Sequence, residues 1–456
     1  MSDETTNNDE GTDRDASEPG GPPGVPPVVP PDPTILGGSY AGEPPKRKPF
    51  AYLAVVIGLI SLAGGAVFFA RSVGTTTGAG TPEAAVQRMF DSLSNEDILG
   101  VLESLHPAER AALSSRFQIM SKELGRLKIL SSDLDLGDVR GIDLEFNGLT
   151  YRTATLDDGI AAVVVTAGRA TYRIEPGDSP LGEFVRGFMT RSGNRVLTGS
   201  DDIGSEQPVF VAVRTDGKWY VSIGYSIAEQ ARRDAGLQPP AFGAGVPARG
   251  ASTPEAAVEQ FLRAVARLDV RRVIELLPAG EAGALHDYAP LFLPEAEKAA
   301  ARARKQFSFT FRTLDLAADT SGDESLVRVD KLAFGVSIPG LGISADYDGK
   351  CFRAEGIEDF LGSNPGPICG KGLSGLSGLP NIPTPKLGIV AVNEGGSWYV
   401  SPIGTWFDAM NAIFKALKPS DLETFKQIFG VFAGFDPSAV GGGSGYPTSI
   451  PIPVPS

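Results

Sequence analysis

The histidines His106 and His286 are the side chains of this sequence best suited to acid or base chemistry at neutral pH. His286 is the better candidate of the two, because Asp287 and Tyr288 follow it directly. General acid–base catalysis needs a titrating group within hydrogen-bond reach of a substrate, and no pairing in the sequence demands that arrangement. A surface or helix-capping role is the better interpretation of His286.

The sequence motifs of nucleophilic serine enzymes and of phosphate-binding loops lack the residues that these chemistries require. No G-x-S-x-G sequence follows a strand-like run, so the elbow that holds a nucleophilic serine is missing. PGPICGKG at 365–372 is faintly similar to a phosphate-binding loop, but Pro365 replaces the first glycine and Gly372 replaces the Ser or Thr that would bind Mg²⁺. We therefore predict no catalytic residue, no cofactor and no metal site.

The chain has two cysteines, Cys351 and Cys369, which we expect to form a disulfide bridge. Disulfides persist in oxidising compartments, where we place this part of the chain. Free thiols are the main alternative. A zinc site is a weaker one, because zinc takes about four ligands and no histidine lies near either cysteine.

Composition divides the 456 residues unevenly. Residues 1–49 are rich in Pro, Asp and Glu, with too little apolar surface to offset chain entropy, so we predict a disordered acidic tail. Residues 50–70, FAYLAVVIGLISLAGGAVFFA, carry no charge and match the length of a membrane-spanning helix. A run this apolar predicts an uncleaved membrane anchor.

The charges that flank residues 50–70 predict their orientation. Lys46, Arg47 and Lys48 precede this run and a lone Arg71 follows it, which favours a cytoplasmic N-terminus and extracytoplasmic domains from residue 71 onward. Small residues four apart could allow weak self-association of the helix: Ala54 with Gly58, and Ser61 with Gly65. The net charge of −14 argues against a nucleic-acid partner, because phosphate binding needs clustered Lys and Arg.

An internal repeat organises the remainder of the chain. TPEAAVQRMF at 81–90 recurs as TPEAAVEQFL at 253–262, and the identities continue through Asp97 with Asp269 and Glu109 with Glu281. Thr-Pro-Glu begins a helix well, since Thr caps it, Pro needs no donor at its first position and Glu meets the positive end of its dipole. The motif therefore predicts two equivalent helices, and a catalytic role for Glu83 or Glu255 is not needed to explain it.

A second pair of similar segments closes each copy. VFVAVRTDGKWYVS at 209–222 matches IVAVNEGGSWYVS at 389–401, and each predicts a β-hairpin. Helices followed by antiparallel strands predict an α+β domain. We mark Trp219, Tyr220, Trp398 and Tyr399 as pocket or core residues. The predicted boundaries are domains at 80–236 and 253–435, an exposed linker at 237–252 and a flexible tail at 436–456.

This layout resembles the NTF2-like (cystatin-like) superfamily, as found in single-pass actinobacterial envelope proteins. The resemblance covers roughly residues 80–235 and 252–432 and rests on the TPEAAV helix, a second short helix, several strands and the closing WYVS hairpin. It implies a fold of one N-terminal transmembrane helix followed by two domains, in which helices cover a curved antiparallel sheet. The mouth of such a cone can hold a small molecule or a partner.

Function stays a set of hypotheses at this level. The leading one is a membrane-anchored binding or scaffold protein of the bacterial cell envelope, without catalysis, whose ligand or partner protein is unknown. The alternatives are an enzyme or small-ligand carrier that uses one cone, and a structural partner of an envelope machine similar to flagellar FliL proteins. The apolar stripe of Trp406, Met410, Ile413 and Leu417 predicts a helix packed on its own sheet, or else one that binds a membrane surface or a partner.

Overall fold

The computed structural model describes residues 78–131, 141–175, 177–189, 196–356, 367–369 and 388–422. The chain divides into two compact units, Met1–Ala51 and Tyr52–Ser456, and every described residue belongs to the second. The tails predicted at 1–49 and 436–456 lie outside the described residues, as does the span predicted at 50–70.

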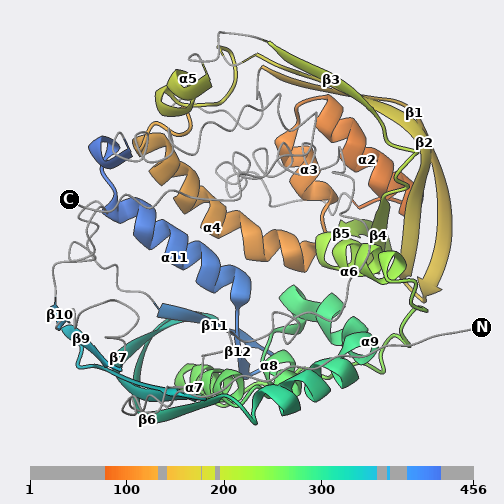
Figure 1. Ribbon diagram of the computed structural model, residues 1–456. Helices are drawn as coiled ribbons and strands as arrows, with labels where there is room; N and C mark the ends of the chain where they lie inside the picture. Colours follow the sequence, from red (N-terminus) through yellow and green to blue (C-terminus); the bar gives the residue numbers. More distant parts are fainter. Residues whose placement is uncertain are drawn as a thin grey trace, which may run out of the picture. The chain divides into compact units, whose positions relative to one another are not determined.

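The fold class predicted from the sequence needs correction. The structure is α+β with curled antiparallel sheets (Figure 1), but no helix of the described ranges is long and apolar enough to cross a membrane. The single transmembrane helix of that prediction therefore has no counterpart among the described helices. The physical reason lies in the helices themselves: the longest ones described, α4 (Pro107–Arg126) and α9 (Ala279–Ala303), carry charged side chains along their lengths.

The first copy runs from Pro82 to Asp234 and forms one sheet with helices at both ends. In the sheet the strand order is β1-β2-β4-β5, with β3 on the free part of β2, and all neighbours are antiparallel. Its elements, besides α4, are α2 (Pro82–Ser94), α3 (Ile98–Ser104), β1 (Ile142–Asp157), β2 (Ile160–Ile174), α5 (Glu183–Met189), β3 (Leu197–Asp202), β4 (Val209–Thr215), β5 (Lys218–Ser222) and α6 (Ile223–Asp234).

The second copy repeats this order with a larger sheet. Its strand order is β10-β9-β8-β7-β11-β12, with β6 on the other side of β7. Its elements, besides α9, are α7 (Pro254–Ala266), α8 (Val270–Glu275), β6 (Ser308–Ser321), β7 (Glu324–Ile338), β8 (Leu341–Tyr347), β9 (Cys351–Glu355), β10 (Ile368–Cys369), β11 (Gly388–Glu394), β12 (Ser397–Val400) and α11 (Pro402–Ala416).

The repeated sequences form the same local structures in both copies. Thr81 caps α2 and Thr253 caps α7, each accepting a hydrogen bond from the backbone N–H three residues later, at 3.2 and 3.1 Å. Asp97 caps α3 and Asp269 caps α8 in the same way. The sequence identities therefore mark positions where a side chain satisfies a helix N-terminus.

The first helix of each copy packs on its own sheet. Phe90 of α2 meets Phe146 of β1 and Phe210 of β4 with ring centroids 4.7 and 5.3 Å apart. Val258 of α7 belongs to a buried cluster with Val327 of β7. These contacts form the hydrophobic cores that the periodicity of the two helices predicts.

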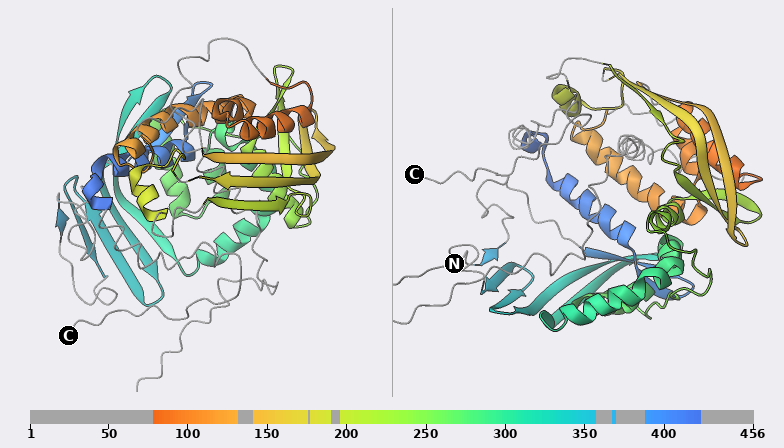
Figure 2. Two further views of the ribbon diagram at one scale, coloured as in Figure 1. Left: turned by 90° about the horizontal axis from the view of Figure 1, so that it is seen from above. Right: turned by 45° about the vertical axis from the view of Figure 1, so that its right-hand side comes forward.

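The last helix of each copy, in contrast, also packs against the other copy. Helix α6 contacts its own β4 and the α9 of copy two, whereas α11 contacts its own β11 and the α4 of copy one. Figures 1 and 2 show α11 running beside α4. Phe407 of α11 is buried against Met120 and Leu124 of α4. The reciprocal contact makes α4, α6, α9 and α11 a shared helical layer between the copies.

Candidate functional site

The last helix of each copy, α6 or α11, begins at a serine that donates a hydrogen bond to a glutamate of the same copy. Ser222 Oγ donates to Glu109 Oε1 at the start of α6, and Ser401 Oγ donates to Glu281 Oε1 at the start of α11, both at 2.6 Å. Each serine also caps its helix. A carboxylate placed here is stabilised by the positive end of the helix dipole. The pairing explains why Glu109 and Glu281 are identical in the repeat.

The second oxygen distinguishes the two glutamates. Glu109 Oε2 accepts a hydrogen bond from the backbone N–H of Ile223 at 2.8 Å. Pro402 occupies the matching position in copy two and has no N–H to donate. As a result Glu281 Oε2 is buried without a hydrogen-bond partner among the described residues. A buried polar atom of this kind calls for a functional or structural explanation.

Burial is the main influence on the carboxyl of Glu281, and it raises the pKa above its usual value of 4.5. The hydrogen bond from Ser401, the charge of Arg116 and the backbone of Ile403 oppose this shift, while the charge of Glu394 adds to it. The net effect is a carboxyl group that is protonated more readily than an exposed one.

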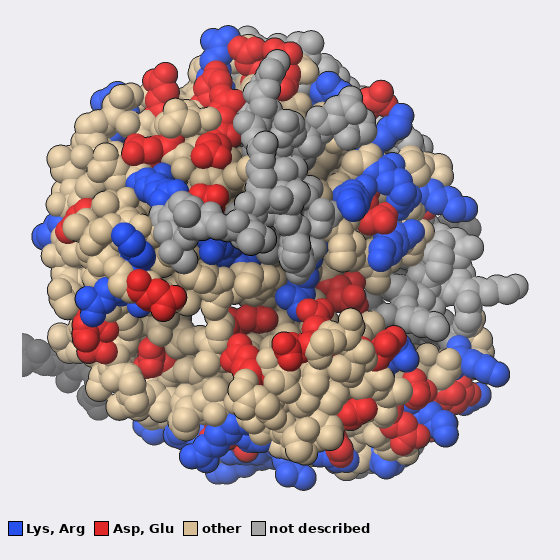
Figure 3. Space-filling view, turned by 180° about the vertical axis from the view of Figure 1, so that it is seen from behind, with Lys and Arg blue, Asp and Glu red and all other residues tan. Residues whose placement is uncertain are grey.

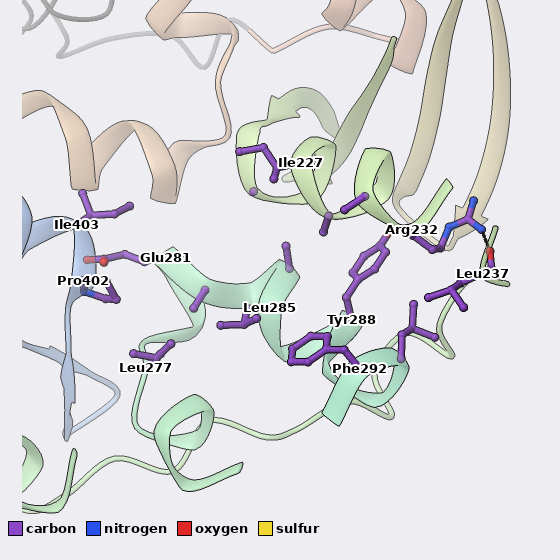
Figure 4. Close-up of a pocket in the computed structure, with 16 residues that line it drawn as sticks. Ile227, Arg232, Leu237, Leu277, Glu281, Leu285, Tyr288, Phe292, Pro402 and Ile403 are labelled. Carbon is purple, nitrogen blue, oxygen red and sulfur yellow. Dashed lines mark hydrogen bonds between the residues drawn. The ribbon is translucent and has the colours of Figure 1, made fainter. Parts of the chain in front are cut away.

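Glu281 lines a cavity of about 540 Å³ between α6, α9 and the first turn of α11. In Figure 4 Glu281 lies beside Pro402 and Ile403 at one end of the lining, and Arg232 and Leu237 lie at the other. Apolar side chains form most of the wall between these ends, among them Leu277, Leu285, Leu291 and Phe292. The size and lining are typical of a small-molecule site, for which about 300 to 1,000 Å³ is usual.

Small residues on α6 create this cavity. Ala228 and Ala231 line it, and the repeat matches them with Phe407 and Met410 of α11, since Ser222 and Ser401 begin the two helices alike. Phe407 fills the equivalent space between α11 and α4, where it is only 5% exposed. In these two related helix interfaces, therefore, the large side chain of Phe407 closes one, and the small side chain of Ala228 leaves the other open.

Several apolar side chains around the cavity are also exposed to solvent. Ile227, Leu237, Leu285 and Phe292 line it, and Ile227 is 65% exposed. Single exposed apolar residues are common, but a group that surrounds a cavity is typical of a binding site. This group gives the cavity an open, apolar mouth.

A buried polar network forms the far wall of the cavity. Glu229 is 1% exposed and accepts hydrogen bonds from Arg232 Nε and Nη2, both at 2.7 Å, and from the Tyr288 hydroxyl at 2.9 Å. Burial and the bond to Glu229 raise the pKa of Tyr288, so the hydroxyl stays protonated. Glu229 thereby neutralises Arg232, and Glu281 is the acidic residue among the described residues of the lining.

The aromatic residues that the sequence marked lie elsewhere. Tyr220 and Tyr399 are buried in the hairpins β4–β5 and β11–β12, and none of the four lines the cavity. Trp219 pairs through its backbone with Ala79, and Trp398 pairs in the same way with Ala251. These four residues therefore act as core and hairpin positions in equivalent structural settings.

The histidines contribute to structure. His106 precedes α4, with Nε2 3.0 Å from Thr215 Oγ1, and burial lowers its pKa. His286 is only 7% exposed, which differs from the surface position expected, and its Nδ1 lies 2.7 Å from the Val246 carbonyl oxygen. Val246 belongs to the predicted exposed linker, yet it is buried against α9. The apolar valine and this hydrogen bond hold the linker on the second copy.

Cys351 and Cys369 form a disulfide between β9 and β10. Within the described ranges, no group of three or more His, Cys, Asp or Glu side chains is placed to hold a metal ion. On the face shown in Figure 3, Lys and Arg are interspersed with Asp and Glu. Ion pairs such as Arg271 with Glu297 join side chains of opposite charge within the described ranges. The described residues of this face form no continuous basic surface.

Comparison with known proteins gives no relative. No family model, no curated protein and no solved structure matches this chain. The site is therefore characterised by its own geometry. Sequence reasoning did not identify Glu281, Ala228 or Pro402 as site residues. The available signal was the identity of Glu109 with Glu281 and of Ser222 with Ser401, combined with proline in one copy only.

Proposed function

We propose that this chain is a non-enzymatic binding protein, and that a small and largely apolar ligand occupies the cavity between α6, α9 and α11. The observation that carries the proposal is that Ala228 stands in α6 where α11 has Phe407, the side chain that fills the matching interface. Empty apolar space loses dispersion contacts and destabilises a fold. A ligand that fills this space would restore those contacts.

Two further features of the sequence support parts of this proposal. The disulfide supports a location in an oxidising compartment, outside the cytoplasm. The NTF2-like resemblance supports a binding role but stays a prediction, and the cavity lies between the two copies rather than inside either sheet.

An enzyme is the second candidate, and Glu281 is the observation that favours it. A carboxyl with a raised pKa beside a cavity can act as a general acid or base. The other ionisable side chains of the lining, Arg232 and Tyr288, both bond to Glu229. Catalysis would need a second available acid or base group in the lining, whereas binding needs none, so binding without catalysis is the simpler explanation of the described lining.

Filling the cavity tests the proposal. Ala228→Phe copies the arrangement of Phe407 and should abolish binding of a neutral apolar dye such as N-phenyl-1-naphthylamine. Wild-type protein should bind the dye saturably, with a rise in fluorescence. Ala235→Phe is the matched control, because Ala235 is an exposed residue at the end of the same helix and outside the lining.

Two results would contradict the proposal. One is the absence of saturable dye binding to the wild-type protein. The other is unchanged binding to Ala228→Phe when circular dichroism shows that the variant is folded.

A further inference from the structure

The polar side chains of the cavity lining are engaged within the protein. Among the described lining residues these side chains are Arg232, Glu281 and Tyr288. Glu229 accepts hydrogen bonds from Nε and Nη2 of Arg232 and from the Tyr288 hydroxyl. The remaining nitrogen of Arg232, Nη1, donates to the carbonyl oxygen of Leu237. This end of the described lining therefore offers a ligand neither a guanidinium nitrogen nor a phenolic hydrogen.

The carboxyl of Glu281, at the other end, is also withheld from the cavity. Its Oε1 accepts a hydrogen bond from Ser401 at 2.6 Å, and its Oε2 is buried. Figure 4 shows the carboxyl directed toward Pro402 and Ile403. A charged group of a ligand inside the cavity would therefore lose its hydration without gaining a partner, which is costly. The cavity favours the apolar part of a ligand.

The mouth of the cavity extends this apolar surface to solvent. Ile227 of α6 is 65% exposed, and Leu285 and Phe292 of α9 are 37% and 38% exposed. All three side chains line the cavity, and Figure 4 shows them on the two helices that border it. A ligand enclosed entirely by the cavity would leave these side chains in water, whereas a chain that continues past the mouth would cover them.

We infer that the ligand is a single-chain amphiphile, whose hydrocarbon chain fills the cavity and crosses the mouth while its polar head stays in solvent. The inference rests on the proposed binding function and specifies its ligand class. Burial of the chain supplies the affinity, because each CH₂ group removed from water adds a similar favourable free energy. The site should therefore distinguish chain lengths and be nearly indifferent to the head group.

Two series of probes test this inference: alkyl sulfates and alkyltrimethylammonium salts, each with hexyl, octyl and decyl chains. Each probe is titrated into the dye-loaded protein below the concentration at which it forms micelles, and displacement of N-phenyl-1-naphthylamine gives its affinity. Two added CH₂ groups should tighten binding about tenfold in either series. At equal chain length the two heads should differ by less than about threefold in about 0.15 M salt, which screens the net charge of the protein.

Ile227→Ser tests where the chain lies without filling the cavity. The decyl probes should lose affinity severalfold, because their chains cross the mouth, whereas the hexyl chains end inside the cavity and should bind as before. Ile223→Ser is the matched control: this isoleucine of the same helix is 41% exposed and lies outside the lining. Circular dichroism of each variant establishes that it is folded.

The outcomes separate this inference from the proposed function. If neither the dye nor any probe binds, the binding function itself is wrong. If the dye binds but affinity does not rise with chain length, or if one head group is strongly preferred at every chain length, the cavity is a binding site but the amphiphile assignment is overturned. Equal losses for hexyl and decyl probes in folded Ile227→Ser would overturn the placement of the chain across the mouth.

Discussion

Glu109 and Ser222 meet at the N-terminus of α6, where the serine hydroxyl lies 2.6 Å from Glu109 Oε1. The backbone N–H groups of Ile223 and Gly224 also donate to this carboxylate, at 2.8 and 2.9 Å. One side chain of α4 thus satisfies the start of a helix that is distant in the sequence. The contact fixes α6 in the position from which it reaches the second copy.

Glu109→Ala should lower the free energy of unfolding by about 2 to 4 kcal/mol, because it leaves buried donors without an acceptor. Urea unfolding followed by circular dichroism measures the change. Asp158→Ala is the control: its carboxylate is 92% exposed, and loss of its pair with Arg214 should cost less than about 1 kcal/mol. Equal losses in the two variants would show that the Glu109 contact is not structural.

The helix caps and β-hairpins of this fold were predictable from the sequence, because each depends on residues within one short segment. The caps Thr81 and Thr253 and the WYVS hairpins depend on residues a few positions apart. The additional packing of α6 and α11 against the opposite copy was not predictable, because it depends on contacts between distant segments. The stripe on α11 predicted packing on its own sheet, and α11 does contact β11, but Phe407 packs against copy one and Trp406 is 51% exposed.

The cavity could not be predicted from the sequence either, because it too depends on which distant segments meet. Ala228 matches Phe407 only when the repeat is aligned on its closing hairpins, since the second copy has a longer middle region. Even with that alignment, the sequence does not show that α6 faces α9. An alanine on a helix indicates a cavity only when the element that faces it is known.

Thr81→Ala and Thr253→Ala should each lower the unfolding free energy by about 1 kcal/mol, since each removes one N-cap hydrogen bond. The two caps lie in separate copies, so the double variant should lose the sum of the two effects. Chemical unfolding of the three variants measures this. Thr→Ser at either site keeps the hydroxyl and should restore most of the stability. A double variant no weaker than either single one would contradict the prediction.

Glu281 should make the stability of the protein depend on pH in a defined direction. A carboxyl with a raised pKa stabilises the fold fully below its unfolded pKa near 4.5, and this contribution is lost as pH rises through the folded value. The unfolding free energy of wild type minus that of Glu281→Gln should therefore fall as pH rises above about 4.5. Urea unfolding between pH 4 and pH 8 measures the difference. A difference that grows with pH would have the wrong sign.

The disulfide should contribute to stability through the 18-residue separation that it closes. The chain-entropy estimate for a loop of this size is about 3 kcal/mol. Cys351→Ser combined with Cys369→Ser should lower the unfolding free energy by this amount in guanidinium titrations. Wild-type protein treated with a reductant should behave like the double variant. If reduction shifts neither the midpoint nor the slope, the bridge has no such role.

Phe407→Ala should open, between α11 and α4, the same kind of space that Ala228 leaves between α6 and α9. Phe407 is 5% exposed, and a buried Phe→Ala change costs about 3 to 5 kcal/mol through lost transfer and the cavity that remains. Trp406→Ala is the matched control: this side chain is half exposed and stacks edge-on against Phe407, so its loss should cost about 1 kcal/mol. Dye binding then gives a second measurement, since the variant should gain a second site. A stable Phe407→Ala protein with a single dye site would show that large side chains are not what closes the α4–α11 interface.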